Sequence, residues 1–568
     1  MRRAPDRVLR VDLSDRTVAS EPVPEAWRRR YLGGKGLGAR YLYDELDAGA
    51  DPLGPENLLC FALGPVSGLL PGETRYAAVT KSPLTGAFLD SYAGGAFPEA
   101  LVGALDDHLA LLVTGAADEP VRIVVEDGDA TVEPATTWGE DAAETCRTHD
   151  GAVACVGPAG EAGVSYATIA SGPNADHHAG RGGAGTVMGA KRLKTVVAHG
   201  SPPDGLTDLR EKYERRYAED ATGRWLAVSD TLETVDFADE AGVLSSRGWS
   251  ERGFDSTDEV GIEAARAAAH GRERADETVA GGFRVETDAG ETVPRGATAM
   301  TLGAGLAIDD FDAVAELGEL CNRLGIDLIS AGNAVAWAVR ASEEGLLADD
   351  YAFGDPAGAR ALLDDIAARD GTLGDALADG VAEAAEELGG DGLVPTVKGM
   401  ELPAYDPRGA ASMALAYATS DRGGCHRRAR PVEREPFDGP FTPAEAATAV
   451  IDAQDTRSVR WSLVSDDFAG ETLRDDGAEW LEAVGAPHGD LAATSERVWN
   501  LVRLFNVREG FTRADDRLPD PIDPASLDAS FEALLDAYYD ARGWDADGVP
   551  TDATLARLDL DHLADDIA

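Results

Sequence analysis

The composition of the chain changes at one point, the segment SPPDG at Ser201–Gly205. Before it, short stretches rich in β-branched and aromatic residues alternate with Gly and Pro, a pattern typical of strands joined by turns. After it, Ala, Glu, Asp, Arg and Leu dominate, and the apolar positions recur with the period of a helix. The chain has 568 residues, more than one hydrophobic core usually organises. The sequence therefore predicts an α+β protein with a β-rich region first and mainly α-helical regions after it.

Two breaks in the sequence suggest three domains. We expect a β-rich domain over residues 1–203, ending at the SPPDG segment. The second break is the turn-rich segment LGGDGLVPTVKG, Leu388–Gly399. It divides the rest of the chain into a helical domain over residues 204–395 and another over residues 396–568.

Some local patterns predict individual elements. The stretch RVLRVDL, Arg7–Leu13, is typical of a strand, and VRIVVEDGDATVEP, Val121–Pro134, of a hairpin that turns at Asp127–Asp129. Further along, a helix is expected to begin near Asp309 and Asp310. Cys321 falls on the apolar face of that helix and should be a buried core thiol.

The charge balance is strongly acidic. Asp and Glu number 103 against 51 Lys and Arg, a formal net charge of -52, yet 44% of the residues are hydrophobic, which excludes wholesale disorder. At about 1 M salt the Debye length shrinks to about 3 Å, so the self-repulsion would be muted in a salty cytoplasm. We therefore expect a halophilic protein. The acidity also argues against a nucleic-acid partner, which needs a basic surface.

Lysine and cysteine are both scarce. Four of the six lysines lie in Gly-rich or turn-like segments, where we expect them to serve a ligand instead of the solvated surface. The five cysteines form no CxxC pair, as expected of a protein in a reducing cytoplasm without a disulfide framework. The N-terminal residues are charged throughout and no run of 18 apolar residues occurs, so neither an export signal nor a membrane partner is expected.

Glycines concentrate in HHAGRGGAGTVMGAKRLK, His177–Lys194. Because glycine lacks a Cβ, a ligand can approach the main-chain N–H groups, which can form an anion-binding nest. The stretch matches neither GxGxxG after a strand nor GxxxxGK[ST]. Two interpretations stay open: a site for phosphate or a similar anion, and a Gly-rich turn before a helix.

Seven segments between Tyr31 and Pro519 share the order of motifs of one family. They are YLGGKGLGARYLYDEL, RYAAVTKSPLTGAFLDSYAGGAF, AGRGGAGTVMGAKRLKTVV, LCNRLGIDLISAG, VKGMELPAYDPRG, LAYATSDRGGCHRRA and FNVREGFTRADDRLP. In these the chain resembles the aldehyde ferredoxin oxidoreductase family of tungsten or molybdenum bis-pterin enzymes. The resemblance implies an N-terminal base of two sheets beneath two pterins that hold one metal, with the pterin phosphates linked through Mg²⁺. It also implies that the Gly-rich loop belongs to this cofactor site.

The resemblance implies a set of cofactor-binding residues. In the N-terminal region these are Arg75, Ala93, Gly94, Gly95, Arg181, Gly182, Gly183 and Ala184. For Arg75 the alternative is a surface ion pair. In NRLGID they are Asn322, Gly325 and Asp327, with Asn322 in place of the family's Asp. The alternative for NRLGID is a helix-ending glycine followed by the cap of the next helix.

The resemblance also implies one catalytic residue. His426 falls where the family has a histidine near the metal, and it would donate to a metal-bound oxygen or carry its proton.

The chain departs from the family where the chemistry takes place. The family's [4Fe-4S] cluster needs four cysteines, but the expected window, Glu273–Asp288, contains none, and Ser462 stands at the fourth position. The family's candidate glutamate base is replaced by Ala297, which cannot accept a proton. In DSYAGG, Tyr92 replaces a small amide.

Two functions remain open on this basis. The first is oxidation of a small aldehyde to a carboxylic acid, with electrons passed to ferredoxin in the family and here to another acceptor or a partner subunit. The second is a non-catalytic paralogue that pairs with an intact homologue or stores cofactor. Family members are commonly dimers, so a homodimer or a heterodimer with a paralogue is expected.

Overall fold

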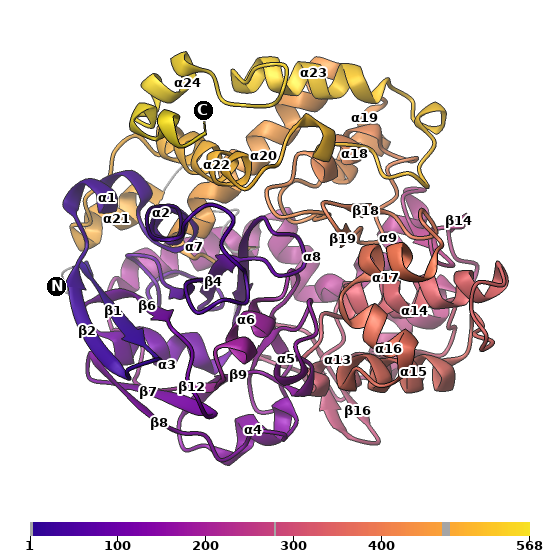
Figure 1. Ribbon diagram of the computed structural model, residues 1–568, viewed down its shortest axis with the longest axis horizontal. Helices are drawn as coiled ribbons and strands as arrows, with labels where there is room; N and C mark the ends of the chain where they lie inside the picture. The colour runs from indigo at the N-terminus through magenta and orange to yellow at the C-terminus, as the bar shows by residue number, and fades with distance from the viewer. Residues whose placement is uncertain (1–3, 278–279, 468–476, 568) are drawn as a thin grey trace.

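The N-terminal region consists of two six-stranded sheets (Figure 1). The computed structural model describes residues 4–277, 280–467 and 477–567. The first sheet has the order β2 (Thr17–Pro22), β1 (Arg7–Asp12), β6 (His108–Thr114), β3 (Leu59–Ala62), β4 (Tyr76–Lys81) and β5 (Phe88–Ala93). The second has the order β11 (His177–Ala179), β10 (Ile169–Ser171), β9 (Ala152–Cys155), β12 (Leu193–His199), β7 (Val121–Glu126) and β8 (Asp129–Pro134).

Strand alternation gives the first sheet two buried faces. In β3, Leu59 and Phe61 point into a core shared with the second sheet and with α3 (Ala96–Leu105), while Cys60 and Ala62 point to the opposite face. On that opposite face lie α2 (Gly34–Glu45) and α22 (Leu491–Arg508). Residues near the C-terminus therefore cover the sheet that forms near the N-terminus.

The predicted hairpin is confirmed. Glu126 pairs with Asp129, so the turn consists of Asp127 and Gly128, with φ of 51° and 77°. Positive φ at both turn residues is what a two-residue hairpin turn of this hand requires. Asp129, which the sequence placed in the turn, is the first residue of β8.

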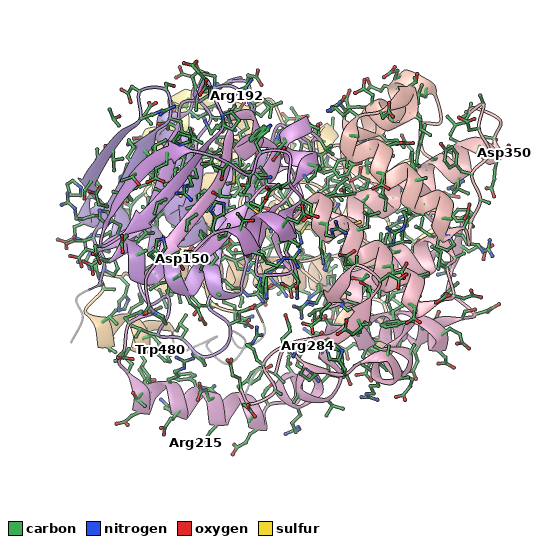
Figure 2. All side chains as sticks on the ribbon, turned by 90° about the horizontal axis from the view of Figure 1, so that it is seen from below. Asp150, Arg192, Arg215, Arg284, Asp350 and Trp480 are labelled. Carbon is green, nitrogen blue, oxygen red and sulfur yellow. The ribbon has the colours of Figure 1, made fainter. Side chains whose placement is uncertain are left out.

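The rest of the chain is mainly helical. In Figure 2 a group of pink helices lies to the right of the sheets, with Asp350 at its far edge, while the α7 helix (Thr207–Glu219) with Arg215 runs below the sheets. The longer helices are α7, α13 (Phe311–Leu324), α14 (Leu328–Glu343), α15 (Pro356–Ala368), α20 (Pro443–Leu463), α22 and α23 (Phe531–Arg542). The carboxylate of Asp310 caps α13, as the sequence predicted, and Cys321 on this helix is fully buried. Within the described residues, none of the helices is both long enough and apolar enough to cross a membrane.

One hydrophobic cluster runs through the helical region. It contains Tyr166 from the N-terminal region, Trp337 on α14, Met413 on α18 (Ala411–Ala418) and Tyr538 on α23. Because one core spans these segments, the boundaries at residues 203 and 395 stay predictions.

Charged residues are buried where α2, β5 and the loop after α18 meet. Lys35 forms ion pairs with Asp421 and, at 3.3 Å, with Asp90, and Arg428 forms ion pairs with the same two carboxylates. The Lys35 ammonium also lies 5.4 Å from the centre of the Trp461 ring. We call these four charged residues the lysine junction. It joins segments that are far apart in sequence.

Removing the charge of Lys35 should destabilise the protein strongly. Lys35→Met leaves Asp90 and Asp421 with one cation between them, and breaking a buried pair costs about 3–5 kcal/mol. Equilibrium chemical unfolding measures the change. Lys212→Met is the control, because its ammonium pairs with exposed Glu479 and such pairs contribute less than about 1 kcal/mol. Equal effects of the two substitutions would contradict a stabilising role for the junction.

Candidate functional site

A cavity of about 370 Å³ lies where the N-terminal sheets meet the helical region. Its walls include the end of β5, the loop before and after β11, the start of α12 (Gly296–Thr298), the end of α13 and the loop after α18. The cavity thus draws on every large part of the chain.

Arginines dominate the charge of the cavity. Eight line it: Arg75, Arg181, Arg274, Arg295, Arg422, Arg427, Arg430 and Arg457. Six carboxylates line it: Glu73, Asp176, Asp230, Asp327, Asp466 and Asp467. A positive excess inside a protein with a formal net charge of -52 favours an anionic ligand.

Seven of the predicted site residues line this cavity. They are Arg75, Ala93, Gly94, Arg181, Asn322, Asp327 and His426. The other five, Gly95, Gly182, Gly183, Ala184 and Gly325, are not among the described residues that line it. At Gly183 an added Cβ would lie 2.2 Å from the carbonyl oxygen of Ser165, so this glycine permits close packing of two backbones. Cofactor contacts at these five residues stay predictions.

Arg181 fixes the Gly-rich loop to the helical region. Its φ is 56°, and Gly182 and Gly183 follow with 85° and 86°, so the chain turns sharply here. The buried guanidinium donates to the carbonyl of Gly424 at 3.0 Å and to that of Glu401 at 2.5 Å, and it lies 3.5 Å from Asp327. The loop is therefore held next to His426.

The segment NRLGID, residues 322–327, ends one helix and caps the next, as its alternative interpretation predicted. Gly325, with φ of 69°, ends α13, and the Asp327 carboxylate accepts the backbone N–H of Ser330 at 2.9 Å as the cap of α14. Asn322 and Asp327 also line the cavity. A capping role leaves a cofactor contact possible, and that contact stays a prediction.

Arg75 forms ion pairs away from the surface, so the surface ion pair that we considered as an alternative to cofactor binding does not form. Its side chain is 17% exposed and lies 3.2 Å from Asp466 and 3.0 Å from Glu73. Burial alone would lower the pKa of Arg75, but these carboxylates raise the pKa above its usual value. The guanidinium is therefore a fixed positive charge on the cavity wall.

A second group of ion pairs joins the N-terminal base to the segment after α11 (Ile262–Ala268). Glu73 lies 2.8 Å from Arg274, Glu273 lies 2.8 Å from Arg295, and His177 lies 3.4 Å from Glu73 and 3.6 Å from Glu273. We call these five residues the clasp. The window expected to hold cluster cysteines starts at Glu273; its Thr278 and Val279 lie outside the described residues.

His426 is a neutral imidazole in a cationic surrounding. Burial, with the charges of Arg430 and Arg181, lowers the pKa of His426 well below its usual value. Its Nδ1 is buried and has no hydrogen-bond partner in the part of the chain that the structure describes. Next to it, Arg422 donates to the sulfur of Cys425 at 3.1 Å. Burial would raise the pKa of Cys425, but Arg422 and Arg428 lower it to about 7.

The expectation that lysines would serve a ligand is wrong. The side chains of five of the six are enclosed by the framework, and none of the six is among the described residues that line the cavity. Lys81 pairs with Glu509 at 2.6 Å and Lys398 with Asp516 at 2.7 Å. Lys191 and Lys194 donate to backbone carbonyls. A buried ammonium must be paired, so these lysines satisfy groups within the fold.

Family models match almost the whole chain. The model described as aldehyde ferredoxin oxidoreductase, N-terminal domain, matches residues 8–200, and the model for domains 2 and 3 matches residues 208–560. The chain belongs to the aldehyde ferredoxin oxidoreductase family.

Relatives in this family are similar over nearly their full length. The tungsten-containing aldehyde ferredoxin oxidoreductase of Pyrococcus horikoshii is 32% identical, over 98% of this chain and 99% of that protein. That of Pyrococcus furiosus is 33% identical over 95% and 96%. An aliphatic sulfonate oxidoreductase, WOR-like subunit, from Pyrococcus furiosus is 25% identical over 98% and 96%.

A solved structure has the same fold. The active site complex BamBC of benzoyl coenzyme A reductase, in complex with 1,5-dienoyl-CoA, superimposes with a TM-score of 0.82 at 25% identity. The match covers 100% of this chain and 98% of that one. The α+β fold class is thereby confirmed, with its two sheets followed by a mainly helical region.

The departures from the family's motifs have clear structural settings. Ser462 is buried on α20, where its hydroxyl donates to Ser458 at 2.6 Å and accepts the N–H of Gly36 at 3.2 Å. The hydroxyl of Tyr92 donates to Asp90 at 2.6 Å, and its ring stacks on Trp461 with 5.2 Å between centres. Ala297 lines the cavity without offering a proton acceptor.

Sequence reasoning missed the clasp, Asp230 and Arg457. Asp230 lines the cavity from the short 3-10 helix Asp230–Glu233, and Arg457 lines it from α20. Neither residue lies in a motif that predicts a site. The sequence contains one indication for Arg457: it lies in RSVRWSLV, the segment in which Ser462 stands at the expected fourth cysteine position.

The clasp should make stability depend on pH in the acid range. Burial would raise the pKa of Glu73, but Arg75, His177 and Arg274 lower it from 4.5 to about 2. A carboxyl with a lowered folded-state pKa stabilises the protein above pH 4.5 and loses that effect as pH falls toward 2. Glu73→Gln should therefore lower the free energy of unfolding by up to about 3 kcal/mol at pH 7, and by less at pH 3. Chemical unfolding at the two pH values tests this; a difference independent of pH would contradict it.

Proposed function

We propose that this chain is an oxidoreductase that oxidises an aldehyde to a carboxylic acid at a tungsten, or molybdenum, bis-pterin centre. The observation that carries the proposal is the cavity with eight arginines against six carboxylates in an acidic protein. Two phosphorylated pterins with Mg²⁺ need such a cationic, partly backbone-lined site. The full-length similarity to tungsten enzymes supports the same cofactor.

The residues of the cavity fit this cofactor. Besides Arg75 and Arg181, buried polar atoms remain for it: Nε of Arg422 and Nδ1 of His426 have no hydrogen-bond partner among the described residues. Buried polar atoms are normally paired, so these two are suited to a polar ligand. When bound, the metal centre supplies two-electron oxidation and oxygen transfer at the carbonyl carbon.

His426 and Asp230 would handle the protons. As a neutral imidazole, His426 has one nitrogen that donates and one that accepts, so it can orient a carbonyl or a water. Asp230 and Ala297 line the same cavity, and their sequence neighbours are in contact, because the N–H of Gly296 donates to the hydroxyl of Thr231 at 3.3 Å. The Asp230 side chain lines the cavity, and burial raises its pKa above the usual value, which suits a proton acceptor.

Electrons must leave by a route other than the family's cluster. The chain lacks the cysteines of the expected window, and Ser462 stands at the fourth position. The name of one relative, a WOR-like subunit, and the BamBC complex both describe assemblies. We therefore propose that a partner subunit, in place of ferredoxin itself, receives the electrons in the cytoplasm.

A second candidate is a non-catalytic paralogue that serves as a scaffold for an intact homologue. Ala297 in place of the glutamate favours it. Co-purification from the native host with a cysteine-complete homologue, without turnover by the isolated chain, would support this second function.

Elemental analysis tests the cofactor. Protein from the native host should contain about one tungsten or molybdenum and Mg, with far less than the four irons of a [4Fe-4S] cluster per chain. Mass spectrometry of the metals, with fluorescence of the oxidised pterin, measures all of these. A preparation free of metal and pterin would exclude the enzyme, and about four irons per chain would contradict the electron route.

Asp230→Asn should lower turnover of an aldehyde by roughly 10²–10⁴-fold, because an amide cannot accept the proton. The tungsten content should stay at the wild-type value, since Asp230 is not among the predicted cofactor residues. Asp208→Asn, at an exposed position on α7, is the matched control. Unchanged turnover in the Asp230 variant would remove this residue from the mechanism.

A further inference from the structure

Arg457 differs from the other arginines of the cavity. Six of those are ion-paired, for example Arg427 with Asp467 and Arg430 with Glu433 at 3.1 Å. Arg422 donates instead to the carbonyl of Asp90 and to Cys425. Arg457, on α20, lines the cavity and has no ion pair or hydrogen bond with any of the residues that the structure describes.

The carboxylates near Arg457 are already engaged. Asp467 accepts from Trp461 Nε1 at 2.9 Å as well as pairing with Arg427, and Glu433 pairs with Arg430. Burial and the charge of Arg430 lower the pKa of Arg457 to about 10, so the guanidinium is still charged at neutral pH. The partly exposed Arg457 guanidinium therefore faces the cavity without an ion pair to any described residue, and an anion from outside the chain would supply one.

Arg457 lines the same cavity as the predicted cofactor residues without being one of them. The charged groups acting on Arg457 are Arg430, Asp467, Glu433 and Arg460. None of these is a predicted cofactor residue, although Asp467 also acts on Arg75 and Arg430 also acts on His426.

We propose that Arg457 binds an oxyanion group carried by the substrate, with Arg430 beside it. This inference rests on the proposed function and narrows its substrate class: the aldehyde carries a carboxylate, phosphate or sulfonate remote from its carbonyl group. A guanidinium presents paired N–H donors that match the oxygens of such groups. Arg457 is then a residue that sets specificity, while His426 and Asp230 face the reacting carbon.

The test compares two ligands that differ by one charged group: monomethyl glutarate, which carries one carboxylate, and dimethyl glutarate, which carries none. Titration calorimetry on the holoprotein at fixed ionic strength should show wild type binding monomethyl glutarate roughly tenfold or more tightly than dimethyl glutarate. Arg457→Met should remove this preference and leave binding of dimethyl glutarate unchanged. Arg457→Lys should retain part of it, because it keeps the charge without the paired donors.

A matched control is Arg434→Met, which removes an exposed arginine paired with Asp438 and should keep the full preference. Thermal unfolding of each variant identifies misfolding, and the ligand comparison on wild type does not depend on any variant. Equal binding of the two ligands by tungsten-containing wild type would overturn the Arg457 assignment alone. Loss of tungsten and pterin from the Arg457→Met variant would also overturn the assignment to substrate, because Arg457 would then bind a phosphate of the cofactor. A tungsten-free wild type would instead overturn the proposed function.

Discussion

The lysine junction is the interaction on which the cavity depends. Asp90 belongs to β5, whose end contributes Ala93 and Gly94 to the cavity wall, and Asp421 begins the loop that carries Cys425 and His426. Lys35 and Arg428 hold these two carboxylates together in the interior. Because a buried carboxylate without its cations is strongly unfavourable, the two walls cannot separate without a large loss of free energy. The position of His426 over the N-terminal base follows from that constraint.

Charged side chains occupy part of the segment in which the family resemblance led us to expect cysteines. The segment expected to carry cysteines provides Glu273 and Arg274, and these join Glu73, His177 and Arg295 in the clasp. The clasp joins the N-terminal base to the segment after α11 through ion pairs. Because the carboxylates of Glu73 and Glu273 are nearly buried, salt should weaken these ion pairs less than it weakens pairs at the surface.

Local features could be predicted from the sequence, whereas the pairing of charges could not. The turn at Asp127–Gly128 and the Asp310 cap depend on a few adjacent residues whose backbone preferences are known. The cavity wall at Arg181 was found because glycine-rich motifs mark backbone positions. By contrast, Asp466 pairs with Arg75 although the two lie 391 residues apart, and no pattern in either segment indicates this partner. The lysines were misjudged for the same reason, since a turn-like segment does not reveal which carbonyls its side chain will reach.

The distribution of lysines has a practical consequence. Five ammonium groups are enclosed, and the Lys212 side chain, on α7, is 52% exposed. Amine-directed reagents such as succinimidyl esters therefore find a single accessible lysine on the folded protein. Coupling to a surface or a dye through that side chain would attach molecules in one orientation, by a helix whose residues do not, apart from Tyr217, line the cavity.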